Sequence, residues 1–283
     1  MQSTIKRALV LSGGGARGAF QLGVWRYLQE RGWDPDLICG TSVGGINAAA
    51  IGAGMPLKDL AQIWKTHHRG MMIRPQLLRF IASLLLRRPF RPVFDTAPLR
   101  AAIRRHLDIA ALRRSRREIL VAAVNLHTAQ LSLFDHRVIG VDHLMATSAI
   151  PILFPWQRID GQPFWDGCVA ANTPLFAALQ RGAREIVVVL LSPVGHRRLA
   201  LPDDTVATAE LALEHFLIGS CPTAELPLAG GREADADRAR IYTVAPSRML
   251  GFRSLLNFSN RQADRLIEEG YRNAHRQLTR LIE

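Results

Sequence analysis

Short apolar runs alternate with helical patterns along most of the chain, and this alternation constrains the fold more than any other feature. Runs typical of strands lie at 8–11, 37–39, 119–126, 131–134, 185–191 and 241–244, and helical patterns at 20–31, 46–53, 207–217 and 259–281. Strands that alternate with helices predict an α/β fold around a mostly parallel sheet. No repeat or low-complexity linker divides the sequence, so we expect one domain over 1–283.

The composition supports a packed core and excludes several other classes of protein. Of the 283 residues, 48% are hydrophobic and 21% are charged, which excludes a disordered, collagen-like or disulfide-stapled chain. Cys39, Cys168 and Cys221 show no C-x-x-C spacing, so we expect no metal and no cofactor. Because no apolar run approaches the roughly 20 residues that span a bilayer and no signal-peptide core is present, we expect a cytoplasmic protein.

A glycine-rich loop follows the first predicted strand and leads into a helix. Its sequence, Gly13-Gly14-Gly15-Ala16-Arg17-Gly18, satisfies the G-x-G-x-x-G pattern, and its backbone N–H groups are suited to binding an anion. A nucleotide-binding module is one interpretation. It also needs an acidic residue at the carboxyl end of the second strand, whereas Asp34 and Asp36 precede that strand.

The second predicted strand runs into Gly40-Thr41-Ser42-Val43-Gly44, which matches G-x-S-x-G and is followed by a helical pattern. A strand, a sharp turn and a helix are the context of a nucleophile elbow, in which Ser42 projects above the sheet. An ordinary turn rich in small residues is the alternative. Adjacent parallel strands bring both glycine-rich turns to one sheet edge, where loop N–H groups and that of Val43 would stabilise an oxyanion.

Asp166 is the predicted base for this serine. The histidines in the later part of the chain, His196, His215 and His275, do not follow a predicted strand, so we expect a carboxylate to accept the proton directly. Asp166-Gly167 follows the apolar residues 163–165, which would place the acid at the edge of an apolar surface. The alternative is that this Asp-Gly pair forms only a turn.

Taken together, the motifs resemble those of bacterial patatin-like phospholipases. The matching pieces are the loop 13–18, the elbow 40–44, the run Ala146-Thr147-Ser148-Ala149-Ile150-Pro151-Ile152-Leu153-Phe154-Pro155, and Asp166-Gly167 with Asn172-Thr173-Pro174. The resemblance implies a three-layer α/β/α fold and hydrolysis of fatty-acyl esters of lipids. It makes Ser42 the nucleophile, Asp166 the base, and Gly13, Gly14, Gly15 and Arg17 the oxyanion region together with Val43. Gly18, Gly40, Gly44 and Gly167 support the motifs.

Two positions depart from the family pattern, and two other functions stay open. Cys168 stands where members often have a second glycine after the Asp-Gly pair, which would change the turn that holds the base. Ser12 stands where an acid or a glycine is common. An acyltransferase would use the same acyl-enzyme, and a nucleotide-binding module would use the glycine loop without ester cleavage. A degenerate scaffold, which would bind lipid without turnover, is a third interpretation.

The segment 70–117 breaks the strand–helix alternation and is unusually basic. The whole chain carries Lys+Arg 36 against Asp+Glu 24. Leucine, isoleucine and phenylalanine in this segment alternate with arginines. We therefore expect a helical cap or insertion that lies against an anionic membrane at its inner face, or that packs on the core or on a dimer partner with its arginines in solvent. No nucleic-acid partner is expected. The arginines are Arg74, Arg79, Arg87, Arg88, Arg91, Arg100, Arg104, Arg105, Arg113, Arg114, Arg116 and Arg117.

Overall fold

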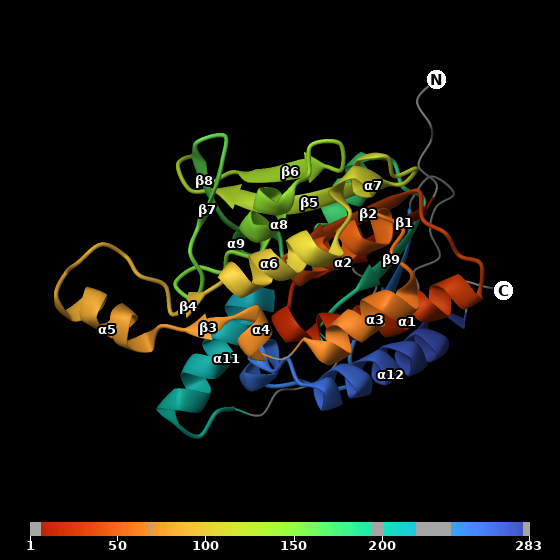
Figure 1. Cartoon of the computed structure of the whole chain (residues 1–283). Helices are drawn as coiled ribbons and strands as arrows, with labels where there is room; N and C mark the ends of the chain where they lie inside the picture. The colour runs from red at the N-terminus through yellow and green to blue at the C-terminus, as the bar shows by residue number, and fades with distance from the viewer. Residues whose placement is uncertain (1–6, 68, 194–200, 219–238, 280–283) are drawn as a thin grey trace.

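A central sheet organises the molecule. The structure is a computed structural model that describes residues 7–67, 69–193, 201–218 and 239–279 (Figure 1). The larger sheet has the strand order β10-β9-β1-β2-β5-β8-β7, with β6 paired to β5, and β3 and β4 form a separate pair. The strands are β1 Arg7–Leu11, β2 Leu37–Thr41, β3 Arg74–Pro75, β4 Phe94–Asp95, β5 Glu118–Asn125, β6 Leu131–Asp135, β7 Gln157–Ile159, β8 Gln162–Asp166, β9 Glu185–Val189 and β10 Arg240–Val244.

Strand direction divides the larger sheet into two parts. β10, β9, β1, β2 and β5 run parallel to one another, whereas β6 and β8 pair antiparallel with β5, and β7 pairs antiparallel with β8. The predicted α/β fold with a mostly parallel sheet is confirmed. The sequence patterns did not predict β7 and β8. β7 has only three residues and β8 contains Pro163, so neither gives an alternating pattern long enough to indicate a strand.

Helices connect the strands and cover both faces of the sheet. The predicted last helix, 259–281, begins at Asn260 and ends at Gln277, and residue 281 lies outside the described residues. The helices are α1 Ala19–Glu30, α2 Val43–Gly52, α3 Leu57–Thr66, α4 Arg69–Met72, α5 Leu77–Leu85, α6 Ala97–His106, α7 Ile109–Arg113, α8 Val141–Thr147, α9 Cys168–Ala171, α10 Leu175–Gln180, α11 Thr205–Ile218 and α12 Asn260–Gln277, with 3-10 turns η1 Gly15–Gly18 and η2 Phe252–Leu256.

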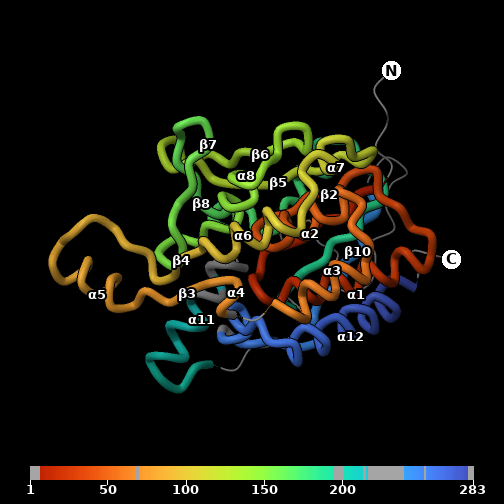
Figure 2. The backbone as a smooth tube through the Cα atoms, in the orientation of Figure 1, coloured from red at the N-terminus to blue at the C-terminus, as the bar shows by residue number. Residues whose placement is uncertain are grey.

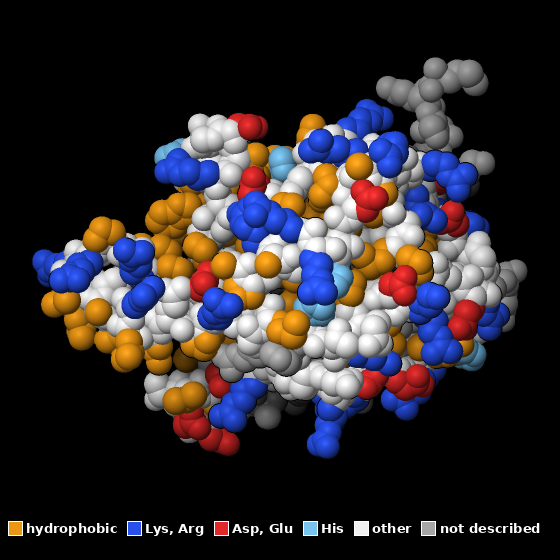
Figure 3. Space-filling view, viewed as in Figure 1, with side chains coloured by type: hydrophobic (Ala, Val, Ile, Leu, Met, Phe, Trp, Pro, Cys, Tyr) orange, Lys and Arg blue, Asp and Glu red, His pale blue; other side chains and the backbone are white. Residues whose placement is uncertain are grey.

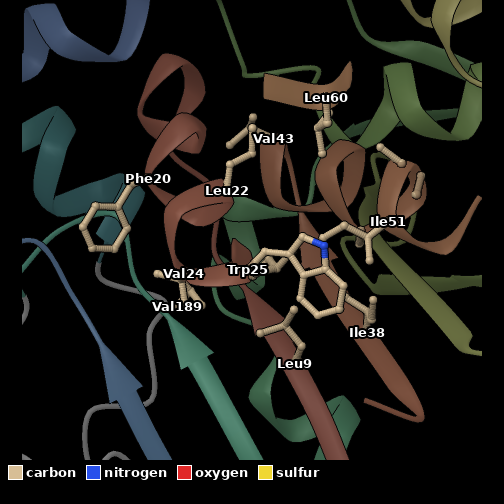
Figure 4. Packing of buried hydrophobic residues seen from close by; sticks show 14 of the residues in the cluster. Leu9, Phe20, Leu22, Val24, Trp25, Ile38, Val43, Ile51, Leu60 and Val189 are labelled. Atoms are coloured by element: carbon tan, nitrogen blue, oxygen red, sulfur yellow. The ribbon is translucent and has the colours of Figure 1, made fainter. Parts of the chain in front are cut away.

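Alternate residues of the strands pack into two different hydrophobic cores. Leu9 and Leu11 of β1 belong to the core that α1, α2 and α12 build, and Figure 4 shows Leu9 near Trp25 of α1 and Ile38 of β2. Ala8 and Val10 of the same strand belong to a second core with Leu175 and its neighbours in α10. Because a strand turns successive side chains to opposite faces, this pairing is the signature of three layers, α/β/α.

The segment 70–117 holds two kinds of element. Leu99 and Ile103 of α6 are buried in the first core. By contrast, α5 projects from the body of the molecule on a loop (Figures 1 and 2). In the part of the chain that the structure describes, no helix combines the length and the hydrophobicity needed to cross a membrane.

Candidate active site

Ser42 occupies a strained turn between β2 and α2. It is a buried non-glycine residue with φ 56° and ψ −129°, and α2 begins at the next residue, Val43. A positive φ is unfavourable for a residue with a Cβ, so the surrounding structure must hold it in place. This geometry is that of a nucleophile elbow.

Close backbone contacts explain the glycines around the elbow. A Cβ on Gly44 would lie 2.2 Å from the carbonyl oxygen of Leu11, and one on Gly40 would lie 2.3 Å from that of Gly44. Neither distance leaves room for a side chain. Glycine at position 44 therefore lets the turn pack against the end of β1, and glycine at position 40 lets the turn close on itself.

Thr147, at the end of α8, holds the backbone of Ser42. The Ser42 N–H donates to Thr147 Oγ1 at 2.8 Å, and the Thr147 hydroxyl donates to the carbonyl oxygen of Ala122 at 2.6 Å. The threonine side chain is buried. It thus links the strained residue to the central strand β5, a role that its place in the sequence did not reveal.

Asp166 ends β8 beside β5, with its backbone paired to Ala123. Its N–H donates to the carbonyl oxygen of Ala149 at 2.9 Å, and its Oδ1 accepts a hydrogen bond from the Cys168 N–H at 2.9 Å. A Cβ on Gly167 would lie 2.6 Å from the Ala122 carbonyl oxygen. The turn that holds Asp166 therefore packs against β5, the strand to which Thr147 is hydrogen-bonded.

The Asp166 carboxyl is fully buried and close to Ser42. Burial raises the pKa of Asp166 to about 7, although hydrogen bonding from the Cys168 N–H and from the Ser42 hydroxyl lowers it. Among the described residues, Asp166 Oδ2 has no hydrogen-bond partner, so this oxygen remains open to accept a proton. Catalytic pairs commonly tighten only when substrate binds.

The glycine loop lies directly against Ser42. A Cβ on Gly13 would lie 3.1 Å from Ser42 Cβ and 2.3 Å from Asn172 Oδ1, and the Gly13 N–H donates to the Asn172 carbonyl oxygen at 3.0 Å. Within the described chain no acceptor is recorded for the N–H groups of Gly14 and Gly15. The loop thus presents open donors beside the serine, as does Val43 at the first position of α2.

The buried side chain of Arg17, in this loop, forms hydrogen bonds with residues far away in the sequence. Its guanidinium donates to Ser254 Oγ at 2.7 Å, to Ser192 Oγ at 2.9 Å and to the Gly251 carbonyl oxygen at 2.8 Å. Next to it, a Cβ on Gly18 would lie 2.5 Å from Val43 Cγ2. These contacts hold the loop against both the elbow and η2.

The two departures from the family pattern have local explanations. Cys168 is the first residue of α9, and its φ angle is not positive. The backbone therefore does not need a glycine at this position. Ser12 Oγ accepts the Leu191 N–H at 3.1 Å. Both side chains are buried and compatible with the turns they occupy.

Among the described residues, this edge of the sheet has neither a histidine partner for Ser42 nor the acid that a nucleotide site would place at the end of β2. Of the histidines that the structure describes, none is hydrogen-bonded to Ser42 or Asp166, and His215 and His275 lie exposed on α11 and α12. Asp36 precedes β2, at the opposite end of that strand from the glycine loop. A hydroxyl, a buried carboxyl and open N–H donors that meet in one place suit acyl transfer instead.

A comparison with protein-family models shows to which family the chain belongs. Residues 9–179, more than half of the chain, match the family model described as patatin-like phospholipase. The chain belongs to this family. The resemblance inferred from the motifs is thereby confirmed, and every patatin-like motif described above falls within the matched residues.

The chain matches only part of the length of its named bacterial relatives. The cGAMP-activated phospholipase of Pseudomonas aeruginosa is 30% identical over 181 residues, which is 59% of this chain and 53% of the relative. The protein of the same name from Vibrio cholerae is 29% identical over 209 residues, 64% of this chain and 58% of the relative. The patatin-like chain thus spans little more than half the length of these curated relatives.

Solved structures share the fold. VipD from Legionella pneumophila aligns with a TM-score of 0.51 at 16% identity, over 98% of this chain and 67% of the other. Human GIVD cytosolic phospholipase A2, in complex with methyl gamma-linolenyl fluorophosphonate, aligns with a TM-score of 0.52 at 12% identity, over 99% of this chain and 58% of the other. At such identities the likeness shows a common fold alone.

Proposed function

We propose that this patatin-like chain is a serine acyl hydrolase that cleaves fatty-acyl esters of lipids through a Ser42–Asp166 dyad. The observation that carries the proposal is a buried serine in a strained elbow next to a buried carboxyl whose pKa is raised to about 7. A base with a pKa near the working pH is best suited to accept and return a proton. Family membership supports the assignment of both residues.

In the first half of the reaction, Ser42 Oγ forms a bond to the acyl carbonyl carbon while its proton passes to the Asp166 carboxylate. The negative charge on the carbonyl oxygen is stabilised by the open N–H groups of Gly14, Gly15 and Val43. Collapse of this intermediate breaks the ester bond, and the leaving alcohol takes the proton from Asp166.

In the second half, water repeats the attack on the acyl-enzyme. Asp166 accepts a proton from the water molecule and then returns it to Ser42 as the fatty acid leaves. In this scheme the Gly13 N–H is already bonded to the Asn172 carbonyl oxygen. Gly13 therefore shapes the glycine loop but donates no hydrogen bond to the oxyanion. Arg17 acts through the loop that it holds, because its guanidinium donates to Ser192, Ser254 and Gly251.

The proposal includes contact with an anionic membrane through the arginine-rich region Arg74–Arg117, by a cytoplasmic protein at the inner face of the membrane. Charge favours this contact, because each basic residue near an anionic surface adds about 1 kcal/mol to binding. Some of these arginines are already paired: Arg100 with Asp142, and Arg117 with Asp34. Five of the other arginines lie in α5 or on the segments that flank it: Arg74, Arg79, Arg87, Arg88 and Arg91.

Hydrolysis of a chromogenic short-chain ester tests the proposed reaction. Ser42→Ala should abolish turnover and covalent labelling by a fluorophosphonate, whereas Ser83→Ala, a buried serine of α5, serves as the matched control. Product analysis with added glycerol separates hydrolysis from acyl transfer to an alcohol. Undiminished turnover in Ser42→Ala would refute the assignment of the nucleophile.

A further inference from the structure

Helix α5 presents its leucines to solvent. Leu78 is 84% exposed, Leu85 75% and Leu84 67%, and Leu77 and Ile81 are also exposed. Their spacing places them along one side of the helix. Figure 3 shows hydrophobic side chains together with Lys and Arg at the end of the molecule where α5 lies. An apolar face this exposed on a short helix is unusual for a surface that meets only water.

The segment that carries this face has charge of only one sign. No acidic residue occurs between residues 70 and 94 of the sequence. In the described part of the chain, the arginines flanking the apolar face have no ion pair and no side-chain hydrogen bond. Unpaired arginines beside exposed leucines are typical of a helix that lies in the interface of an anionic bilayer. These arginines are Arg74, Arg79, Arg87, Arg88 and Arg91.

A second segment extends the apolar surface beyond α5. Phe90 and Trp156, both exposed, stack with ring centroids 5.2 Å apart and an interplanar angle of 16°. Ile152, in the turn between α8 and β7, is exposed as well. Tryptophan is favoured at the boundary between lipid and water, where its ring is half buried and its N–H remains wet.

The same segment, 147–156, also reaches the candidate active site. Its carbonyl oxygens at Ile152 and Leu153 accept the N–H groups of Val93 (3.2 Å) and Phe94 (2.9 Å), which follow the α5 loop. At its other end Thr147 accepts the Ser42 N–H. One short piece of chain therefore joins the exposed apolar surface to the backbone of the nucleophile.

We infer that the apolar face of α5, the Phe90–Trp156 stack and Ile152 form one lipid-docking surface that inserts into an anionic bilayer. This surface, rather than the whole basic region, would bring the enzyme to its substrate, and in this sense the inference rests on the proposed function. The two phenomena are nevertheless separable, because docking depends on the leucines and hydrolysis depends on Ser42 and Asp166.

A bilayer fits the surface better than a protein partner does. The five flanking arginines carry no complementary acid, so a second copy of this chain would bring like charges together. A bilayer of anionic lipid neutralises all of them and buries the leucines at the same time. Self-association through this face is nevertheless a measurable outcome.

Co-sedimentation with vesicles of equal parts phosphatidylglycerol and phosphatidylcholine tests docking. The variant Leu78→Asp/Leu85→Asp should lower the partition coefficient about 100-fold, because each buried leucine contributes about tenfold. Charge reversal of Arg87, Arg88 and Arg91 should lower it by at least about 100-fold, and rising salt should weaken wild-type binding. Val138→Asp, an exposed apolar residue on another part of the surface, is the matched control and should bind as wild type.

Fluorescence shows whether the surface enters the lipid. Vesicles should shift the tryptophan emission of the wild type to shorter wavelength. Trp156→Phe should remove most of that shift, since Trp156 is the most exposed of the five tryptophans: Trp25 and Trp33 are buried, and Trp64 and Trp165 are half-buried. Equal vesicle binding by wild type and Leu78→Asp/Leu85→Asp would overturn the inference. So would a wild-type dimer that this variant converts to a monomer and that ignores vesicles.

The water-soluble chromogenic ester separates the two failures. If the wild type binds vesicles through the leucines but does not cleave the ester, the proposed reaction fails and the docking surface stands. If the ester is cleaved and vesicle binding does not depend on the leucines, the docking surface fails and the proposed reaction stands.

Discussion

The candidate active site and the α5 surface are opposites in physical terms, although one segment of chain, 147–156, connects them. At the site a polar hydroxyl and a carboxyl are buried. Thr147 links the backbone of Ser42 to β5, and the Cys168 N–H donates to the Asp166 carboxyl. On α5 apolar side chains are exposed, and nothing within the described residues covers them. Burying Asp166 opposes folding, whereas exposing leucine on a projecting helix hardly affects it. The first region therefore needs support from the whole fold, and the second needs a partner.

The largest effect should follow from removing the dyad. We expect Ser42→Ala and Asp166→Asn each to lower kcat by about 10⁴-fold or more, and the double variant to be hardly worse than either, because the two residues act as one unit. Steady-state rates on a chromogenic ester measure this. Multiplicative losses in the double variant would show that the two side chains act independently.

Burial of Asp166 should make the stability of the protein fall as pH rises. The folded-state pKa of about 7 lies above the usual 3.8, so the folded protein holds a proton that the unfolded chain has already lost between these values. The ionised carboxyl then costs up to about 4 kcal/mol above pH 7. Asp166→Asn should be more stable than wild type at pH 8, and this advantage should shrink towards pH 4.

Thermal or urea unfolding at several pH values measures this difference. Asp160→Asn, at an exposed turn, is the matched control and should show little pH-dependent gain. A wild type whose stability rises between pH 5 and pH 8 relative to Asp166→Asn would contradict the burial argument.

Removing the Thr147 hydroxyl should slow catalysis by about 10- to 100-fold. Thr147→Val leaves the Ser42 N–H without its acceptor, which costs about 1–3 kcal/mol and loosens the elbow. Thr147→Ser keeps the oxygen and should recover most of the rate. Because the effect concerns the position of the nucleophile, kcat should fall while KM changes little. A parallel loss in both variants would point to packing of the threonine methyl group instead.

The smallest effect on stability should come from α5. Leu78→Asp/Leu85→Asp removes no buried contact, so the free energy of unfolding should change by less than about 0.5 kcal/mol. Urea unfolding measures this directly. A large loss would mean that the leucines are covered in solution, and the contrast between the two regions would no longer hold.

Much of the geometry of the candidate site was predictable because its signals are local. The glycines around Ser42 mark a turn that no side chain fits, and the Asp-Gly pair marks the end of β8. The role of Thr147 was not predictable, since its two partners, Ser42 and Ala122, lie 105 and 25 residues away in the sequence. The hydrogen bond between the Gly13 N–H and Asn172 was hidden for the same reason.

The sequence by itself determined the strand–helix alternation, the two glycine-rich turns and the charge of the segment 70–117, because periodicity, missing Cβ atoms and charge can be read one window at a time. Only the tertiary structure decided which N–H groups stay open, how strongly burial raises the pKa of Asp166, and which part of 70–117 packs on the core while α5 stands free. Burial and long-range pairing are properties of the assembled layers, and no local run of residues contains them.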